Sequence, residues 1–271
     1  MIELLENRSV IKIYGPDAEK FLQGQTTNDI IKNQYSYNFI LNNQGRYLFD
    51  FFVFRENNEI FYIDIHNDSA DKFLKRLAMY KLRSALDLEN VSSDFSVLYS
   101  KKQVENTLFS LQDPRSSKLG FRSIIKQDNI DQSKSYPKNL YLADKYDMAI
   151  IDGDVDLEYE KSIPIEYGAD NFNAIDYKKG CYIGQEVISR AKYQGVIRKK
   201  IYKLNFGTEI ALISKGAVIT DLDGNKIGIV CSCYEKIAIA QLREEKYLGL
   251  DKKIAIIDHH SADISVPGWR S

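Results

Sequence analysis

The spacing of hydrophobic and polar positions changes several times along the chain, and each change predicts a different element. Residues 16–23 begin with a proline and acidic residues and end before a glycine, as a short helix does. From Tyr35 to Leu41 apolar and polar residues alternate, which predicts a strand with one mostly polar face. Residues 47–55 are apolar on both faces apart from Asp50. They predict the buried middle strand of a meander that ends with residues 60–65.

The spacing becomes helical after residue 68 and strand-like again after residue 199. Apolar residues recur at helical intervals behind an Asp/Ser cap, namely Phe73, Leu74, Leu77 and Leu82. Later, short β segments separated by turns suit a small antiparallel barrel, at residues 199–206, 217–222, 226–234, 236–242 and 253–257. Strands and helices therefore occur in clusters, which predicts an α+β fold rather than a parallel α/β sheet. We expect two units, residues 1–198 and residues 199–271.

Composition narrows the class of protein. With 271 residues, 44% of them apolar, the chain can bury a sizeable core, and its apolar runs are too short for a transmembrane helix. The first residues lack the basic and apolar parts of a secretory signal. Three cysteines, Cys181, Cys231 and Cys233, cannot form a disulfide framework. The cytosol is therefore the expected location, with the mitochondrial matrix of a processed protein as the alternative.

Positive charge is concentrated in one segment of a chain whose net charge is −1. Residues 178–203 carry eight basic residues and one acid, a local charge of 8 − 1 = +7. The basic residues are Lys178, Lys179, Arg190, Lys192, Arg198, Lys199, Lys200 and Lys203. Such a run is explained equally well by a solvated face of a helix and a strand or by a polyanionic partner.

The same segment begins with a glycine-bracketed loop, Lys179-Gly180-Cys181-Tyr182-Ile183-Gly184-Gln185-Glu186. Two glycines four positions apart suit a tight loop that approaches another group closely and opens into a helix. In that helix Glu186 and Arg190 are four residues apart and can pair for about 0.3–0.5 kcal/mol. Adjacent lysines near a helix start favour the thiolate of Cys181, which makes it the candidate reactive group; the alternative is a small packing residue.

This loop resembles a known signature. Residues 179–186, with Arg190 and Gly195 after them, resemble the signature of the YgfZ-type proteins, which are folate-binding relatives of the glycine cleavage T-protein. The resemblance extends over essentially the whole chain. It includes Phe21 to Asp29, Gly45-Arg46 with Asp50-Phe51, and Asp113-Pro114-Arg115 with Gly120 and Arg122.

The resemblance implies a T-protein-like folate-binding region followed by a C-terminal β-barrel, with tetrahydrofolate or a derivative in a central opening. It also implies support of iron–sulfur enzymes, including tRNA-modifying ones, through assembly or repair of their clusters. Partners would be iron–sulfur client proteins or assembly factors, in a monomeric or weakly associated protein. The residues it implies for the folate are Arg46, Asp50, Asp113, Arg115 and Arg190. A glutamylated folate needs an apolar slot, a few polar partners and cations at the rim.

Two departures from the family pattern bear on activity. The T-protein has adjacent aspartates where this chain has Phe49-Asp50, which disfavours ordinary aminomethyl transfer. The stretch from Tyr146 to Ile151 also lacks an arginine that the family often carries.

Three readings of the function stay open. The first is a folate-binding accessory factor for iron–sulfur enzymes. The second is a folate-dependent one-carbon transferase, and the third is an RNA-binding module that uses the basic residues 178–203 for weak contact with tRNA. We expect no stable metal, because a single Cys-x-Cys, here Cys231 and Cys233, is weak evidence for a metal site.

Overall fold

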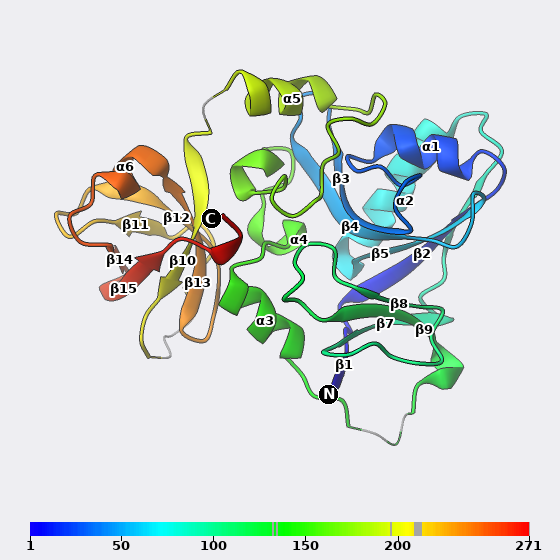
Figure 1. Cartoon of the computed structure of the whole chain (residues 1–271), viewed down its shortest axis with the longest axis horizontal. Coiled ribbons are helices and arrows are strands. Elements are labelled where there is room, and N and C mark those ends of the chain that lie inside the picture. Colours follow the sequence, from blue (N-terminus) through cyan, green and yellow to red (C-terminus); the bar gives the residue numbers. More distant parts are fainter. Residues whose placement is uncertain (132, 134, 196, 209–212, 271) are drawn as a thin grey trace.

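The computed structural model describes residues 1–131, 133, 135–195, 197–208 and 213–270. The fold is α+β, with two antiparallel sheets in the first part of the chain and a closed barrel in the second (Figure 1). The first sheet is five-stranded, in the order β3 (Tyr35–Leu41), β4 (Tyr47–Arg55), β5 (Ile60–His66), β2 (Arg8–Tyr14), β6 (Asp87–Asn90). The second is four-stranded, in the order β1 (Ile2–Leu4), β7 (Phe95–Ser100), β9 (Phe121–Lys126), β8 (Phe109–Gln112).

The barrel occupies the end of the chain. Its strands follow the order β10 (Lys199–Asn205), β13 (Ile237–Arg243), β12 (Lys226–Tyr234), β11 (Val218–Thr220), β14 (Ile254–Ile257), β15 (His260–Ser265), and β15 pairs with β10 to close it. Each β segment expected from the sequence corresponds to one of these strands. The closing strand β15 was not predicted, because its alternation is short and it follows Asp258-His259, a turn without glycine or proline.

The α-helices are α1 (Ala18–Gln25), α2 (Asn67–Lys81), α3 (Leu140–Met148), α4 (Gly153–Asp156), α5 (Gln185–Tyr193) and α6 (Glu244–Leu248). Short 3-10 turns occur at Gln127–Asn129, Pro164–Tyr167 and Gly268–Arg270. The helix expected after residue 68 is α2, but its N-cap is the ring of His66, which accepts from the backbone N–H of Asp68, rather than the expected Asp/Ser cap. None of the described helices is long and apolar enough to cross a membrane.

Strand β4 is buried on both faces, as its sequence predicts. Phe49 and Phe51 face one core, which α1 and α2 cover. Phe52 and Phe54 face a second core, between the two sheets. Because side chains alternate along a strand, Asp50 lies on the same face as Phe52 and Phe54. A carboxylate is thus held between the two sheets.

Strand β3 differs from the expectation in one respect. Its polar face, with Ser36 and Asn38, is buried rather than solvated. Asn38 compensates for this burial because its side chain accepts from the backbone N–H of Asn28 at 3.1 Å and donates to Ser36. Alternation alone does not distinguish water from a buried amide network as the partner of a polar face.

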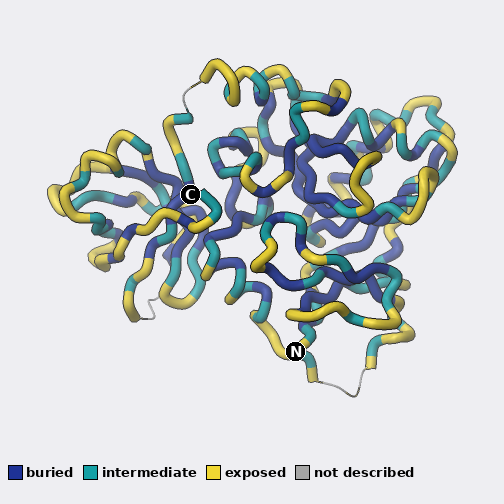
Figure 2. Tube along the Cα trace, viewed as in Figure 1, coloured by how far each residue is buried: buried dark blue, intermediate teal, exposed yellow. Residues whose placement is uncertain are grey.

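The barrel packs against the rest of the chain through shared core residues and the C-terminal turn. The core between the sheets continues into the barrel at Ile201, Cys231 and Ile239. Figure 2 shows buried chain running through this junction. Trp269 adds a tether, because its indole N–H donates to the carbonyl of Met148 at 3.0 Å.

Candidate functional site

A cavity of about 240 Å³ lies between the start of the chain, strand β4 and the segment around α4. Its walls carry acids, a histidine, an arginine and apolar side chains; among them are Glu3, Leu5, Arg8, Asp50, His66, Tyr141, Asp152, Asp154 and Val155. Of the five residues expected to bind folate, Asp50 is the one that lines this cavity.

Asp50 is 2% exposed and is held by neutral donors. Its carboxylate accepts from the hydroxyls of Tyr37 at 2.8 Å and Tyr47 at 3.0 Å, and from the backbone N–H of Asp154 at 3.2 Å. The close approach depends on Gly153, where a Cβ would lie 2.3 Å from Asp50 Oδ1. The first turn of α4 therefore accommodates the carboxylate because it begins with glycine.

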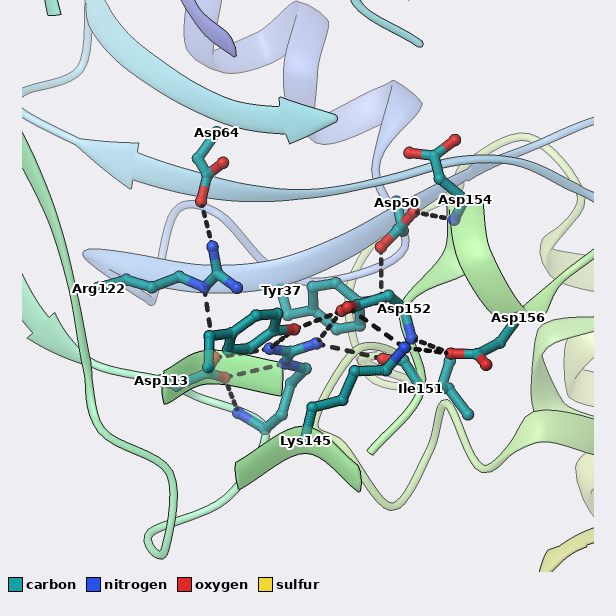
Figure 3. A network of polar contacts seen from close by, with 12 residues as sticks. Tyr37, Asp50, Asp64, Asp113, Arg122, Lys145, Ile151, Asp152, Asp154 and Asp156 are labelled. Atoms are coloured by element: carbon teal, nitrogen blue, oxygen red, sulfur yellow. Dashed lines mark hydrogen bonds and ion pairs between the residues drawn. The ribbon is translucent and has the colours of Figure 1, made fainter. Parts of the chain in front are cut away.

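Asp154 forms a second carboxylate in the same place. Its Oδ1 accepts from Ser69 Oγ at 2.5 Å and from the Tyr47 hydroxyl at 3.3 Å. Its Oδ2 is buried and has no hydrogen-bond partner among the described residues. Burial, followed by the negative charge of Asp50, raises the pKa of Asp154 to about 7. Figure 3 shows Asp154 beside Asp50, at one end of a larger polar network.

The other polar groups of the cavity are fixed by their own partners. Arg8 pairs with Asp64. Burial, followed by the positive charge of Arg8, lowers the pKa of His66, so His66 is neutral at pH 7. Because His66 Nδ1 accepts a hydrogen bond, its ring proton lies on Nε2. The Glu3 carboxylate accepts hydrogen bonds from the backbone N–H groups of Asn139 and Tyr141, both at 2.7 Å.

A series of alternating charges, the central ion chain, runs from the five-stranded sheet to the barrel. Figure 3 shows the part of it between Asp64 and Asp156. In order it consists of Arg8, Asp64, Arg122, Asp113, Arg115, Asp152, Lys145 and Asp156, and Asp156 accepts from Ser232 of β12. Four acids and four bases balance, since 4 − 4 = 0. Asp50 and Asp154 stand outside this balance, because neither forms an ion pair with a described residue.

Asp113 and Arg115 belong to the central ion chain rather than to the cavity wall. The side chains of both are fully buried and pair at 2.7 Å. Burial alone would raise the pKa of Asp113, but Arg115 and Arg122 hold it below its usual range. Arg115 also donates to Asp152 at 2.8 Å and to the carbonyl of Ile151 at 3.2 Å. Asp113 and Arg115 therefore support the cavity through Asp152.

The glycine-bracketed loop docks on the first sheet. Gly184 has φ +84°, and a Cβ there would lie 2.7 Å from the carbonyl oxygen of Asn42, in the turn between β3 and β4. Lys179 extends to the end of α1, where its ammonium donates to the carbonyls of Gln23, Thr26 and Asn28 at 2.6–2.8 Å. Burial lowers the pKa of Lys179 to about 8. The Tyr182 ring is buried beneath this ammonium, 5.3 Å away.

All three cysteines are free, and Cys181 is the exposed one. Cys231 is buried in the barrel and Cys233 is half-buried there. Among the described residues, no group of three or more His, Cys, Asp or Glu side chains is placed to hold a metal ion. Cys181 is thus the accessible thiol of the three.

The basic segment is less positive in space than in sequence; its residue 196 lies outside the described part. Five of its eight basic residues have acidic partners: Arg190 pairs with Glu186, Lys192 with Asp170, Lys199 with Glu166, Lys200 with Glu244 and Lys203 with Asp147. The expected pair of Glu186 and Arg190 is confirmed at 2.6 Å, with both side chains exposed. No described residue of the segment lines the cavity.

Two more expected residues are placed apart from the cavity. Arg46 donates to the carbonyl of Lys161, and Gln185 begins α5. Sequence reasoning did not find Asp154, because it lies 104 residues from Asp50 and no local pattern joins them. The usable signal is the alternation of acids at Asp152, Asp154 and Asp156 after the strand-like run that ends at Ile151.

The fold is that of the T-protein. The chain superimposes on the glycine cleavage system aminomethyltransferase T of Bartonella henselae with a TM-score of 0.73 and 14% identity. The match covers 98% of this chain and 84% of that one. At this identity the likeness concerns the fold. No family model matches the chain.

The chain is similar in sequence to proteins named iron–sulfur cluster assembly factor IBA57. It is 31% identical to the homologue of Pyricularia oryzae over 73% of this chain and 55% of that one, and 30% identical to that of Dictyostelium discoideum over 73% and 60%. The mouse protein is 26% identical over 98% of this chain and 84% of its own length. The chain thus spans little more than half the length of the first two relatives.

These relatives correct one expectation and refine another. Their names describe mitochondrial proteins, which contradicts the expected cytosolic location and points to the mitochondrion. The resemblance to a T-protein relative is confirmed, but the relatives carry the IBA57 name rather than the YgfZ label.

Proposed function

We propose that this protein acts in the assembly of iron–sulfur clusters and that its cavity binds a tetrahydrofolate-type cofactor. The observation that carries the proposal is the exposed thiol of Cys181, held in a rigid loop, on a chain similar to iron–sulfur cluster assembly factors over 73–98% of its length. Lys179 and Gly184 dock the loop on the first sheet and α1, on either side of the thiol in sequence.

The cavity supports the folate part of the proposal. At about 240 Å³ it lies just below the roughly 300–1,000 Å³ of small-molecule pockets, which suits the bicyclic head of a folate with the tail in the opening. The residues present fit such a group, because the cavity has a buried acceptor without a partner at Asp154 and donors at Arg8 and His66. A reduced folate would supply a one-carbon carrier or a reducing ring when bound.

Cys181 supplies the second part of the mechanism. A thiolate is a ligand for iron and a nucleophile, and an exposed one is reachable by a protein partner. Cys181 therefore suits transient contact with a cluster or with a cysteine of an assembly partner. The resemblance to YgfZ-type proteins supports including tRNA-modifying enzymes among the clients.

One-carbon transfer is the second candidate function, and the paired carboxylates favour it. Phe49 does not weigh against it as expected, because Phe49 packs on Phe73 on the face of β4 opposite to Asp50. An acid at position 49 would not enter the cavity, whereas Asp154 does. RNA binding is disfavoured by the five acidic partners of the basic segment.

The test is complementation of cells that lack the gene. We expect reduced activity of iron–sulfur enzymes, including one that modifies tRNA, and no rescue by Cys181→Ser, which keeps size but not the thiolate. Cys233→Ser is the matched control and should rescue. Full rescue by the soluble serine variant at position 181 would remove the thiol from the mechanism. Loss of glycine cleavage in the same cells would favour one-carbon transfer instead.

A further inference from the structure

Asp50 and Asp154 compete for the same donor. The hydroxyl oxygen of Tyr47 lies 3.0 Å from Asp50 Oδ1 and 3.3 Å from Asp154 Oδ1, and it carries a single proton. It can serve one of them at a time. The remaining donors are neutral as well: Tyr37 for Asp50 and Ser69 for Asp154.

Two adjacent buried carboxylates that have no paired cation repel each other when both are ionised. Arg8, which lines the same cavity, is already paired with Asp64 in the central ion chain. The backbone N–H of Asp154 donates to Asp50, which keeps the two residues together. Repulsion between like charges in a buried place is relieved when one proton is shared by the pair. The orphaned Oδ2 of Asp154 is a position for that proton.

We propose that Asp50 and Asp154 share one proton at neutral pH and that this acid pair is the recognition element of the cavity. The pair then offers both a carboxylic O–H donor and a carboxylate acceptor. A ligand that fits has a ring-nitrogen acceptor next to N–H donors on one flat edge, as the pteridine of a reduced folate has. The ligand part rests on the proposed folate binding, and the shared proton does not.

The pKa values of several groups around the pair are shifted away from the neutral range. Burial raises the pKa of Tyr37 and Tyr47 far above the neutral range. Burial lowers the pKa of His66 below its ordinary value. Burial would raise the pKa of Asp152, but Lys145 and Arg115 hold it well below its usual range, and Arg8 stays charged. The pKa of Asp154, about 7, places the change in charge of the acid pair between pH 6 and pH 9.

The shared proton is tested first without ligand, by infrared difference spectra of the whole protein between pH 6 and pH 9. We expect a protonated-carboxyl band that disappears with a midpoint near pH 7 and is absent in Asp154→Asn. The exposed acid Asp71 on α2 provides the control, and Asp71→Asn should keep the band. A wild-type protein without such a band would overturn the proposal.

Recognition is tested by calorimetric titration with tetrahydrofolate. Because the ligand prefers the protonated pair, wild-type affinity should fall about fivefold from pH 7 to pH 8 and about tenfold from pH 8 to pH 9, with proton uptake. Asp154→Asn imitates the neutral acid, so its affinity should match that of the wild type at pH 6 and stay constant to pH 9. Asp154→Ala, which offers no hydrogen bonds, should bind weakly throughout.

The outcomes distinguish recognition by the acid pair from folate binding itself. Wild-type binding that is independent of pH and equal in Asp154→Asn and Asp154→Ala would overturn recognition by the pair and leave folate binding intact. No binding of tetrahydrofolate at any pH would overturn the proposed folate function and the recognition role with it. A titrating carboxyl band would still establish the shared proton in that case.

Discussion

Gly184 shows how one residue positions the candidate thiol. Its φ of +84° is costly for any side chain, and a Cβ would lie 2.7 Å from the Asn42 carbonyl. We expect Gly184→Ala to lower the free energy of unfolding by about 2 kcal/mol, from backbone strain and this contact. Urea denaturation measures the change. Gly180→Ala is the matched control, since a Cβ there meets nothing within 4 Å. Equal losses in the two variants would contradict the docking of the loop.

At the residue scale, the sequence marked the loop more clearly than the cavity. Gly184 and Cys181 are visible because the loop is a contiguous signature, and the structure gives the glycine its physical reason. Asp50 stood out as an acid in an apolar strand. Asp154 did not, because its importance depends on a distant partner, Asp50 of strand β4, and on the glycine before it.

At the scale of elements, Lys179 fastens the loop to α1. Its ammonium satisfies three carbonyls at the end of α1 and just beyond it, Gln23, Thr26 and Asn28. We expect Lys179→Met to lose about 2 kcal/mol of unfolding free energy at pH 7, since buried carbonyls lose their donor. Chemical denaturation of both proteins checks this difference.

The same lysine predicts how this difference depends on pH. Because its pKa falls from 10.5 to about 8 on folding, the unfolded state binds the proton more tightly between these values. Wild-type stability relative to Lys179→Met should therefore rise as pH increases from 8 to about 10. A relative stability that is flat or falls over this range would show that the ammonium is not desolvated.

Helices and strands were predictable where the local pattern of apolar residues was clear. Residues 47–55 are apolar on both faces, and β4 is buried on both faces. The four-stranded sheet was not anticipated, because it pairs β1 with β7, strands almost a hundred residues apart, and pairing partners are invisible to local spacing. The closing strand β15 alternates over few residues, because Ala262 and Ile264 are its buried side chains, and so short an alternation is a weak signal for a strand.

At the scale of the whole molecule, the central ion chain joins both sheets and the barrel. Asp113 pairs with two arginines, so Asp113→Asn leaves buried positive charge uncompensated. We expect a loss of about 3–5 kcal/mol in unfolding free energy, measured by urea denaturation. Because the pairs are buried, the loss should be similar at low and high salt. Glu186→Gln, which breaks an exposed pair, should cost less than about 1 kcal/mol. A loss of that small size for Asp113→Asn would show that the central ion chain is dispensable for stability.

The balance of the central ion chain also constrains how this protein can change over generations. Each interior member contacts opposite charges on both sides, so neutralisation of one residue leaves one buried charge of the central ion chain uncompensated. Neutral drift at these positions therefore requires coordinated substitutions, a charge and its counter-charge together, whereas exposed pairs such as Glu186 and Arg190 can drift singly. In related sequences we expect Asp113 and Arg115 to be kept or lost as a unit. Their co-variation would trace the junction of the sheets with the barrel.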